Sequence, residues 1–314
     1  MLAKLAQSAA PADGAELKDA RHVVFVLPKT SKLEGLRDVP FRDVLAAALA
    51  RRKKKLDDLT ASAVSTDLPQ GALAAWVTLD PSHSPFEQGT ALRKAMQLAL
   101  GERPEQLTVA VYGSATQRRH AAELAVYAAW VNGARLPERK KKSGGAALQS
   151  VRLHGYRAPD GFSKQRAVAE GNFLCRELTV LPPNELTPGG YRKRVRQLAQ
   201  RQGWRHEEYD VKRLRKMGAG AFAAVAQGSA EADAAIVHLR YRHPHANVAG
   251  PAVAIGSATP SQNRRASPSR GTFEGTHQLL VSTEVRGPGC RGPRHGHAGI
   301  VRPHSPLDGT HCGR

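Results

Sequence analysis

Two different kinds of sequence make up this 314-residue chain, and the change between them falls after Gly256. The part before the change alternates short apolar runs with amphipathic stretches, and it contains every lysine of the chain. The part after it has 8 arginines, 9 glycines and 6 prolines, with almost no apolar periodicity. Such a Gly and Pro content without a repeat is typical of disordered sequence. We therefore expect the packed core to come from residues 1–256.

An α/β domain is predicted for residues 1–155. Short apolar runs predict strands at 22–27, 74–79, 108–112 and 148–156. Apolar residues at helical spacing predict helices over 41–52, 91–100 and 116–132. This alternation favours a mostly parallel or mixed sheet with helices packed on it.

A second, incomplete α/β domain is predicted for residues 160–256. The patterns predict helices over 165–179, 188–202 and 211–217, and strands at 205–209, 235–239 and 252–255. Thr187 is placed to cap the second of these helices, with Pro188 at its first position and Gly203 at its end. Asp210 is placed to cap the third.

Several motifs occur in a fixed order in this second region. They are Ala-Glu-Gly and Arg-Glu-Leu within 169–178, Pro-Pro-Asn-Glu-Leu-Thr-Pro at 182–188, Lys-Met-Gly-Ala-Gly-Ala at 216–221, Ala-Gln-Gly-Ser at 226–229 and the strand 236–241. Together they resemble the opening of the catalytic domain in the leucyl aminopeptidase (cytosol aminopeptidase) family of metallopeptidases. Residues 20–155 are similar in size and pattern to the family's N-terminal domain, without a diagnostic motif.

This resemblance implies a cytoplasmic hydrolase that removes N-terminal residues from peptides and assembles as a homo-hexamer. Members of the family use two divalent cations, which can be zinc, manganese or magnesium. The ions activate a water molecule and polarise the carbonyl of the peptide bond. Carboxylates and a lysine hold the ions, while a second lysine and an arginine bind substrate and stabilise the tetrahedral intermediate.

The match stops where these functional residues should begin. The family continues with Gly-Lys-Gly and Phe-Asp-Thr-Gly-Gly, which supply metal ligands, whereas Ser257 stands at the position of that lysine. The later Asn-Thr-Asp-Ala-Glu-Gly-Arg motif is also absent, and the only carboxylates beyond Gly256 are Glu274, Glu284 and Asp308. We therefore assign no catalytic residue and no metal ligand, and leave substrate-binding residues unknown. We expect this chain to bind no metal and to be inactive.

A frameshift is the simplest explanation for residues 257–314. The chain would then be a truncated member of the family that ends in a non-homologous tail. Restoring one base before an AGC codon at Ser257 would yield the lysine of the family. A genuine disordered tail is the alternative.

The tail also holds zinc-type ligands, at Cys290, His295, His297, His304, His311 and Cys312. Their spacing fits no paired zinc module, so chance enrichment is the simpler interpretation.

The formal charge of +20 leaves a different function open. Basic runs at 51–55 and 139–142 could bind a nucleic acid by displacing counterions from its phosphates. No aromatic residues interleave with the runs, so solvated helix ends and linkers are the competing interpretation. A third hypothesis is a non-catalytic module that docks on an intact hexamer of the family.

The remaining features indicate a protein of a reducing, aqueous compartment. No run of 18 apolar residues predicts a membrane span, and the N-terminus lacks the pattern of a signal peptide. Three cysteines are too few for a disulfide framework. We expect Cys175 to be a small buried residue of its helix, and His238 to be a core or surface histidine rather than a ligand.

Overall fold

The structure is a computed structural model that describes residues 2–138, 146–227, 233–241, 252–257 and 279–284. It divides into two compact units, Met1–Leu186 and Thr187–Arg314. The first unit contains a six-stranded sheet with helices, and the second contains helices with two-stranded sheets. The predicted α/β class is therefore confirmed, whereas the domain limits given above stay predictions.

Unit 1 is built on a sheet whose strands neighbour one another in the order β1-β6-β5-β2-β4-β3. The strands are β1 (Lys4–Ser8), β6 (Ser150–His154), β5 (Gln106–Val111), β2 (His22–Pro28), β4 (Leu73–Leu79) and β3 (Val64–Asp67). All neighbours are parallel except β3, which runs antiparallel to β4. The parallel strands therefore end at one common edge of the sheet.

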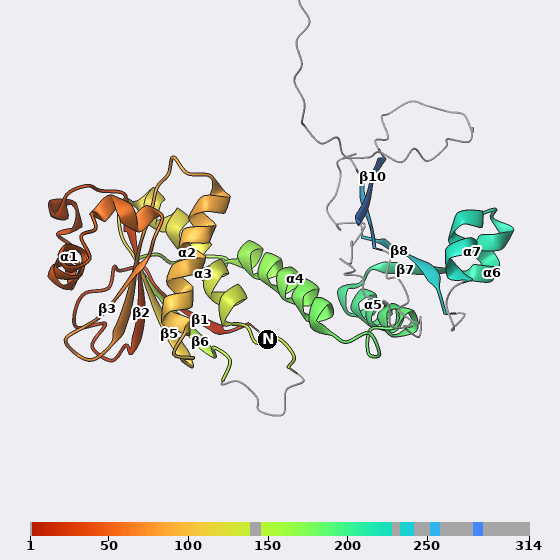
Figure 1. Ribbon diagram of the computed structural model, residues 1–314, viewed down its shortest axis with the longest axis horizontal. Coiled ribbons are helices and arrows are strands. Elements are labelled where there is room, and N and C mark those ends of the chain that lie inside the picture. Colours follow the sequence, from red (N-terminus) through yellow and green to blue (C-terminus); the bar gives the residue numbers. More distant parts are fainter. Residues whose placement is uncertain (1, 139–145, 228–232, 242–251, 258–278, 285–314) are drawn as a thin grey trace, which may run out of the picture. The chain divides into compact units, whose positions relative to one another are not determined.

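Both faces of this sheet are covered, which explains why its central strands are continuous apolar runs. Helices α2 (Pro85–Leu100), α3 (Ala115–Gly133) and α4 (Ser163–Val180) contribute to the core on one face. Helix α1 (Arg42–Arg51) and the 3₁₀ turns η1 (Leu33–Leu36) and η2 (Leu56–Thr60) cover the other. Figure 1 shows α1 apart from the pair formed by α2 and α3. Alternate residues of β2, such as Val24 and Phe25, point into opposite cores.

Local sequence sets the start of the two long helices of this unit. Ser84 and Ser114 each accept a hydrogen bond from a backbone N–H three residues later, and the side chains of Glu87 and Gln117 return the contact. At the end of β6, Gly155 has φ +98°, and a Cβ there would lie 2.2 Å from the Val111 carbonyl oxygen. Only glycine fits this position.

The predicted strands and helices of unit 1 are all present, with three differences. Strands β1 and β3 were not predicted, because each is a short edge strand without a strong apolar pattern. Helix α2 starts at Pro85, six residues before the predicted start, since the signal lies in its cap rather than its apolar stripe. Helix α3 runs from Ala115 to Gly133, one residue longer at each end than the predicted range 116–132.

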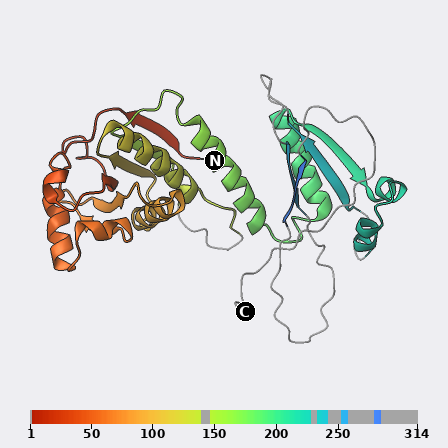
Figure 2. The same cartoon turned by 90° about the horizontal axis from the view of Figure 1, so that it is seen from above.

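Unit 2 begins with α5 (Pro188–Gln202), followed by β7 (Arg205–Asp210), α6 (Val211–Lys216), α7 (Gly220–Ala226) and β8 (Ala235–Arg240). Strands β7 and β8 pair antiparallel, and α5 packs against them, as Figure 2 shows. The predicted caps are confirmed: Thr187 accepts from Gly190 N, Asp210 accepts from Arg213 N, and Gly203 ends α5 with φ +68°.

A second antiparallel pair joins β9 (Ala252–Ser257) to β10 (Leu279–Glu284). Strand β9 was predicted, whereas β10 belongs to the segment that the sequence assigns to the tail. The rest of that tail lies outside the described residues. In the part of the chain that the structure describes, no helix combines the length and the apolarity needed to cross a membrane.

Candidate functional site

The position at which the family resemblance requires a metal-binding lysine is the last residue of β9. Ser257 pairs there with Leu279 of β10. A serine hydroxyl is neutral and much shorter than a lysine side chain, so it cannot replace an ammonium or amine group beside two cations. The sequence comparison thus places a serine where the resemblance implies a lysine, at the end of a strand that was predicted.

The donor set of the described residues does not fit a two-metal centre. Two hard divalent cations need several carboxylate oxygens converging on one place. Within the described ranges, no group of three or more His, Cys, Asp or Glu side chains could hold a metal ion. Glu284 ends β10, while Glu274, Asp308 and the six zinc-type ligands of the tail lie outside the described residues.

The one cysteine for which a position is described is exposed, so the expectation that Cys175 is buried was wrong. Helix α4 turns a different face toward α3: Ala169 is fully buried, and Arg176 donates to the Val131 carbonyl oxygen at 2.6 Å. Cys175 precedes Arg176 by one residue, about 100° around the helix, which carries it off the buried face. His238, for which a core or a surface position was expected, is an exposed residue of β8.

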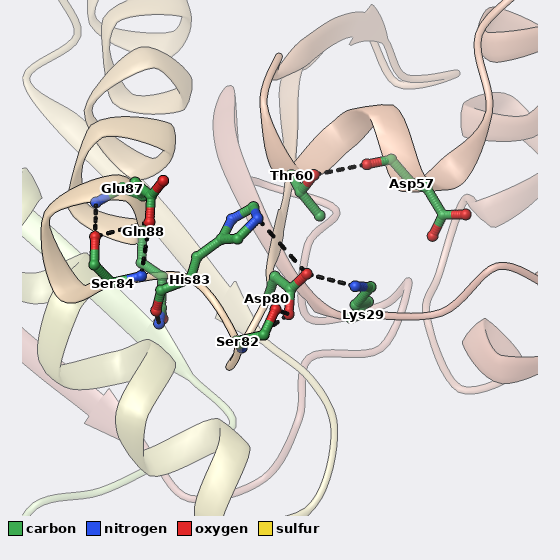
Figure 3. A network of polar contacts seen from close by, with 9 residues as sticks. All are labelled: Lys29, Asp57, Thr60, Asp80, Ser82, His83, Ser84, Glu87 and Gln88. Atoms are coloured by element: carbon green, nitrogen blue, oxygen red, sulfur yellow. Dashed lines mark hydrogen bonds and ion pairs between the residues drawn. The ribbon is translucent and has the colours of Figure 1, made fainter. Parts of the chain in front are cut away.

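A polar network that the sequence did not predict occupies the carboxyl-end edge of the sheet in unit 1 (Figure 3). Lys29 follows β2 and donates to Asp80, which follows β4 and has only 5% of its side chain exposed. Ser82 donates to Asp80 through both its backbone N–H and its hydroxyl. His83 Nε2 lies 3.8 Å from the same carboxylate.

These contacts determine the charge state of the network. The hydrogen bond from Lys29, followed by those from Ser82, holds the pKa of the Asp80 carboxyl well below its ordinary range. The same contact with Asp80 raises the pKa of Lys29. Both groups therefore stay charged at neutral pH, and the Ser82 hydroxyl donates to a carboxylate whose lowered pKa makes it a weak base. The arrangement orders the loop between β4 and α2, and it lacks an activated nucleophile.

A shallow hollow lies beside this network, where the ends of β2, β4 and β5 face α2 and α3. Its floor is mainly apolar, and its polar rim includes Gln88 and His120, which contact each other at 2.8 Å. Gln88 also donates to the His83 carbonyl oxygen. Sequence reasoning missed the site because its residues come from three separate connections. The one local signal was Asp-Pro-Ser directly after a predicted strand, which favours a turn.

The described chain consists of one α/β unit with a six-stranded, mostly parallel sheet and a second unit of helices and two-stranded sheets. Comparison with known proteins relates both units to one family. Residues 173–258 match the model of the cytosol aminopeptidase family, catalytic domain. A probable cytosol aminopeptidase of Prochlorococcus marinus is 36% identical over 75 residues, which are 24% of this chain and 15% of that protein. One from Methylorubrum extorquens is 52% identical over 64 residues, or 20% and 13% of the two chains.

Solved structures extend the likeness to the fold of both units. A mutant of tomato leucine aminopeptidase superposes with a TM-score of 0.63 at 18% identity, over 78% of this chain and 52% of that one. The leucyl aminopeptidase of Trypanosoma cruzi gives 0.54 at 19% identity, over 77% and 49%. This chain thus spans about half the length of the solved structures that it resembles.

The resemblance predicted from the sequence is therefore confirmed: residues 173–258 match the catalytic domain of the cytosol aminopeptidase family, and the fold is similar to that of leucine aminopeptidases. The family model ends at residue 258, next to the position where the sequence motifs stop. The family itself consists of metallopeptidases. The activity, metals, substrates and assembly of this particular chain are treated below as proposals.

Proposed function

We propose that this chain is a non-catalytic form of a cytosol aminopeptidase, whose full-length relatives act on peptides with two divalent ions. The observation that carries the proposal is Ser257, which replaces the ligand lysine directly after a segment that follows the family. The missing Phe-Asp-Thr-Gly-Gly and Asn-Thr-Asp-Ala-Glu-Gly-Arg motifs support it. Without two cations, neither the water nor the peptide carbonyl is activated.

An activity assay tests this proposal. We expect the purified chain, incubated with manganese and an amino-acyl anilide, to release no more product than a metal-free control. The variant Ser257→Lys should remain inactive, because a single restored ligand leaves the carboxylates missing. Turnover that depends on manganese in the unmodified chain would overturn the proposal.

The origin of residues 257–314 has a separate test in the coding DNA. Under the frameshift hypothesis, another frame downstream of the Gly256 codon encodes Phe-Asp-Thr-Gly-Gly and then Asn-Thr-Asp-Ala-Glu-Gly-Arg. A corrected protein would then be a candidate for the family's manganese-dependent, hexameric, cytoplasmic enzyme. If no frame encodes those motifs, the tail is native to this chain, and the frameshift hypothesis is wrong.

A second candidate function is binding to nucleic acid, which the excess of cations in unit 2 favours. In its described residues 187–227 and 233–241, Lys and Arg outnumber Asp and Glu by eleven to four. The run at 51–55 supports it less, because Arg52 donates to the Ser65 carbonyl oxygen and Lys54 to the Ser62 hydroxyl. The run at 139–142 lies outside the described residues. A steep loss of duplex binding with added salt, lessened more by neutralising Lys212 and Lys216 than by neutralising Lys53–Lys55, would support this function.

A further inference from the structure

One face of the β7–β8 pair gathers positive charge across the two strands. Side chains alternate between the faces of a strand, so every second residue of β7 shares a face with its partner on β8. The register places Arg205 opposite Arg240, Glu207 opposite His238, and Tyr209 opposite Ile236. The residues between them face the other way; there Glu208 accepts a hydrogen bond from Arg192 of α5.

The pair of opposed arginines is the unusual feature of this face. Directly opposite residues of an antiparallel pair have Cβ atoms about 4.5–5.5 Å apart, and like charges at such positions destabilise the pair. Both Arg205 and Arg240 are exposed. Neither forms a salt bridge with another residue of the described segments. Their charges therefore face the same space, which they share with one carboxylate, that of Glu207.

The surroundings of the two arginines leave that space available to an anion. A shallow hollow is lined by Arg205, Arg240, Glu207 and His238. The one carboxylate, Glu207, already has a cationic partner, since Arg213 Nη2 lies 3.1 Å from it. Arg213 also stacks on the ring of Tyr209, with its guanidinium carbon 4.2 Å from the centroid. Arg213 thus neutralises Glu207 and is held on the same side of the sheet.

We propose that this face of β7 and β8 binds a phosphate group between the guanidinium groups of Arg205 and Arg240. A tetrahedral anion with several acceptor oxygens matches two planar forks of N–H donors, and such charge-assisted contacts are stronger than neutral hydrogen bonds. The bound anion also offsets the repulsion between the two guanidinium groups. The proposal does not depend on whether the chain is active.

Titration of the full chain with inorganic phosphate, followed by calorimetry, tests the site. We expect saturable binding that is weakened about tenfold or more in Arg205→Gln and in Arg240→Gln, because each loses one charged fork. The matched control is Arg194→Gln, which removes the same charge from an exposed position of α5 and should change the affinity less than about twofold. Arg240→Lys keeps the charge without the fork and should fall between the two.

Thermal melting in phosphate-free buffer separates lost binding from lost folding. Because the two arginines repel each other, Arg205→Gln and Arg240→Gln should melt no lower than the unmodified chain. Added phosphate should raise the melting temperature of the unmodified chain and of Arg194→Gln, but not of the other two. Equal weakening in all the glutamine variants, no saturable binding, or lower melting of the two site variants would each overturn the proposal.

A competition experiment identifies the source of the phosphate. Single-stranded oligothymidylate that displaces inorganic phosphate, with an affinity that falls steeply with salt, would indicate a nucleic-acid backbone. Phosphate binding that the oligonucleotide does not compete with would indicate a free phosphate ligand. Failure of the phosphate site would leave the peptidase proposal untouched, since the two are measured by different assays.

Discussion

Unit 1 and unit 2 differ in how completely their described strands are covered. In unit 1 the largest side chains, Trp76 and Trp130 among them, are fully buried between the sheet and its helices. In the described part of unit 2 the buried apolar residues are Ala199, Leu214 and Ala223, while Ile236 is 43% exposed. Unit 1 therefore has its complete core, whereas the described elements of unit 2 leave apolar surface that further elements cover in a finished α/β domain.

The two units also differ in their charge. Basic and acidic residues are close to balanced in the described residues of unit 1, at 23 and 19, but stand at eleven to five in those of unit 2. A unit with a small core and a large excess of one charge has less hydrophobic stabilisation and more repulsion. We therefore expect unit 1 to be the more stable unit and unit 2 to depend more on its polar contacts.

The largest expected effect is on the core of unit 1. Trp76 stacks on Phe25 with ring centroids 3.9 Å apart, and its indole N–H donates to the Thr66 hydroxyl at 2.8 Å. Trp76→Ala should lower the free energy of unfolding by about 3–5 kcal/mol, since it leaves a cavity and an unpaired hydroxyl. Ile236→Ala in unit 2 should cost less than about 1 kcal/mol. Urea unfolding followed by circular dichroism measures both, and similar losses would contradict the difference between the units.

An intermediate effect is expected from pH, through one carboxylate in each unit. The pKa of Asp80 is lowered by Lys29 and Ser82. Burial raises the pKa of Glu208, but hydrogen bonds from Arg192 and Arg196 outweigh it, so the net shift is also downward. A lowered pKa stabilises the fold above the unfolded-state value of about 4, and this contribution is lost as the pH falls through the folded-state value.

Asp80→Asn and Glu208→Gln should therefore destabilise the protein at pH 7, and each difference from the unmodified chain should shrink below about pH 4. Melting temperatures across pH 3–7 measure it. Asp43→Asn is the control, because Asp43 is 89% exposed and its contact with Arg42 is 3.8 Å long. A deficit that is constant with pH would show that the lost contact is not electrostatic.

The smallest expected effect is on the helix caps, which the two units share. Ser84→Ala removes the acceptor for Glu87 N, and Thr187→Ala removes the acceptor for Gly190 N. Each should cost about 1 kcal/mol, because one backbone N–H loses its partner. Ser84→Asp should restore the stability of α2. A much larger loss in Thr187→Ala would indicate that the start of α5 positions more of unit 2 than its own first turn.

Local features of the structure were largely predictable from the sequence. The apolar run 22–27 became β2, and the cap at Thr187 and the end of α5 at Gly203 formed as predicted. These features depend on neighbours within four residues, so the amino-acid order is sufficient to specify them. The short strands β1 and β3 were missed because pairing with β6 and β4, rather than their own pattern, makes them strands.

The candidate sites also include one feature that the sequence predicted and others that it did not. An ordered comparison of motifs was enough to recognise that Ser257 stands where the family has its ligand lysine. The Lys29–Asp80 contact joins residues 51 positions apart, and Arg205 lies opposite Arg240 across 35 positions. Such pairs come from separate connections that the sheet brings to one edge or one register, which no local pattern records.

The order of residues was enough to predict the α/β class, the end of the aminopeptidase resemblance near Gly256, and the limits of most helices. The three-dimensional structure was needed to find that β1 lies beside β6, that Asp80 is buried against Lys29, and that two arginines oppose each other on one face. The physical reason is that helix periodicity and capping act over a few residues, whereas strand order, register and charge pairing depend on contacts between distant segments.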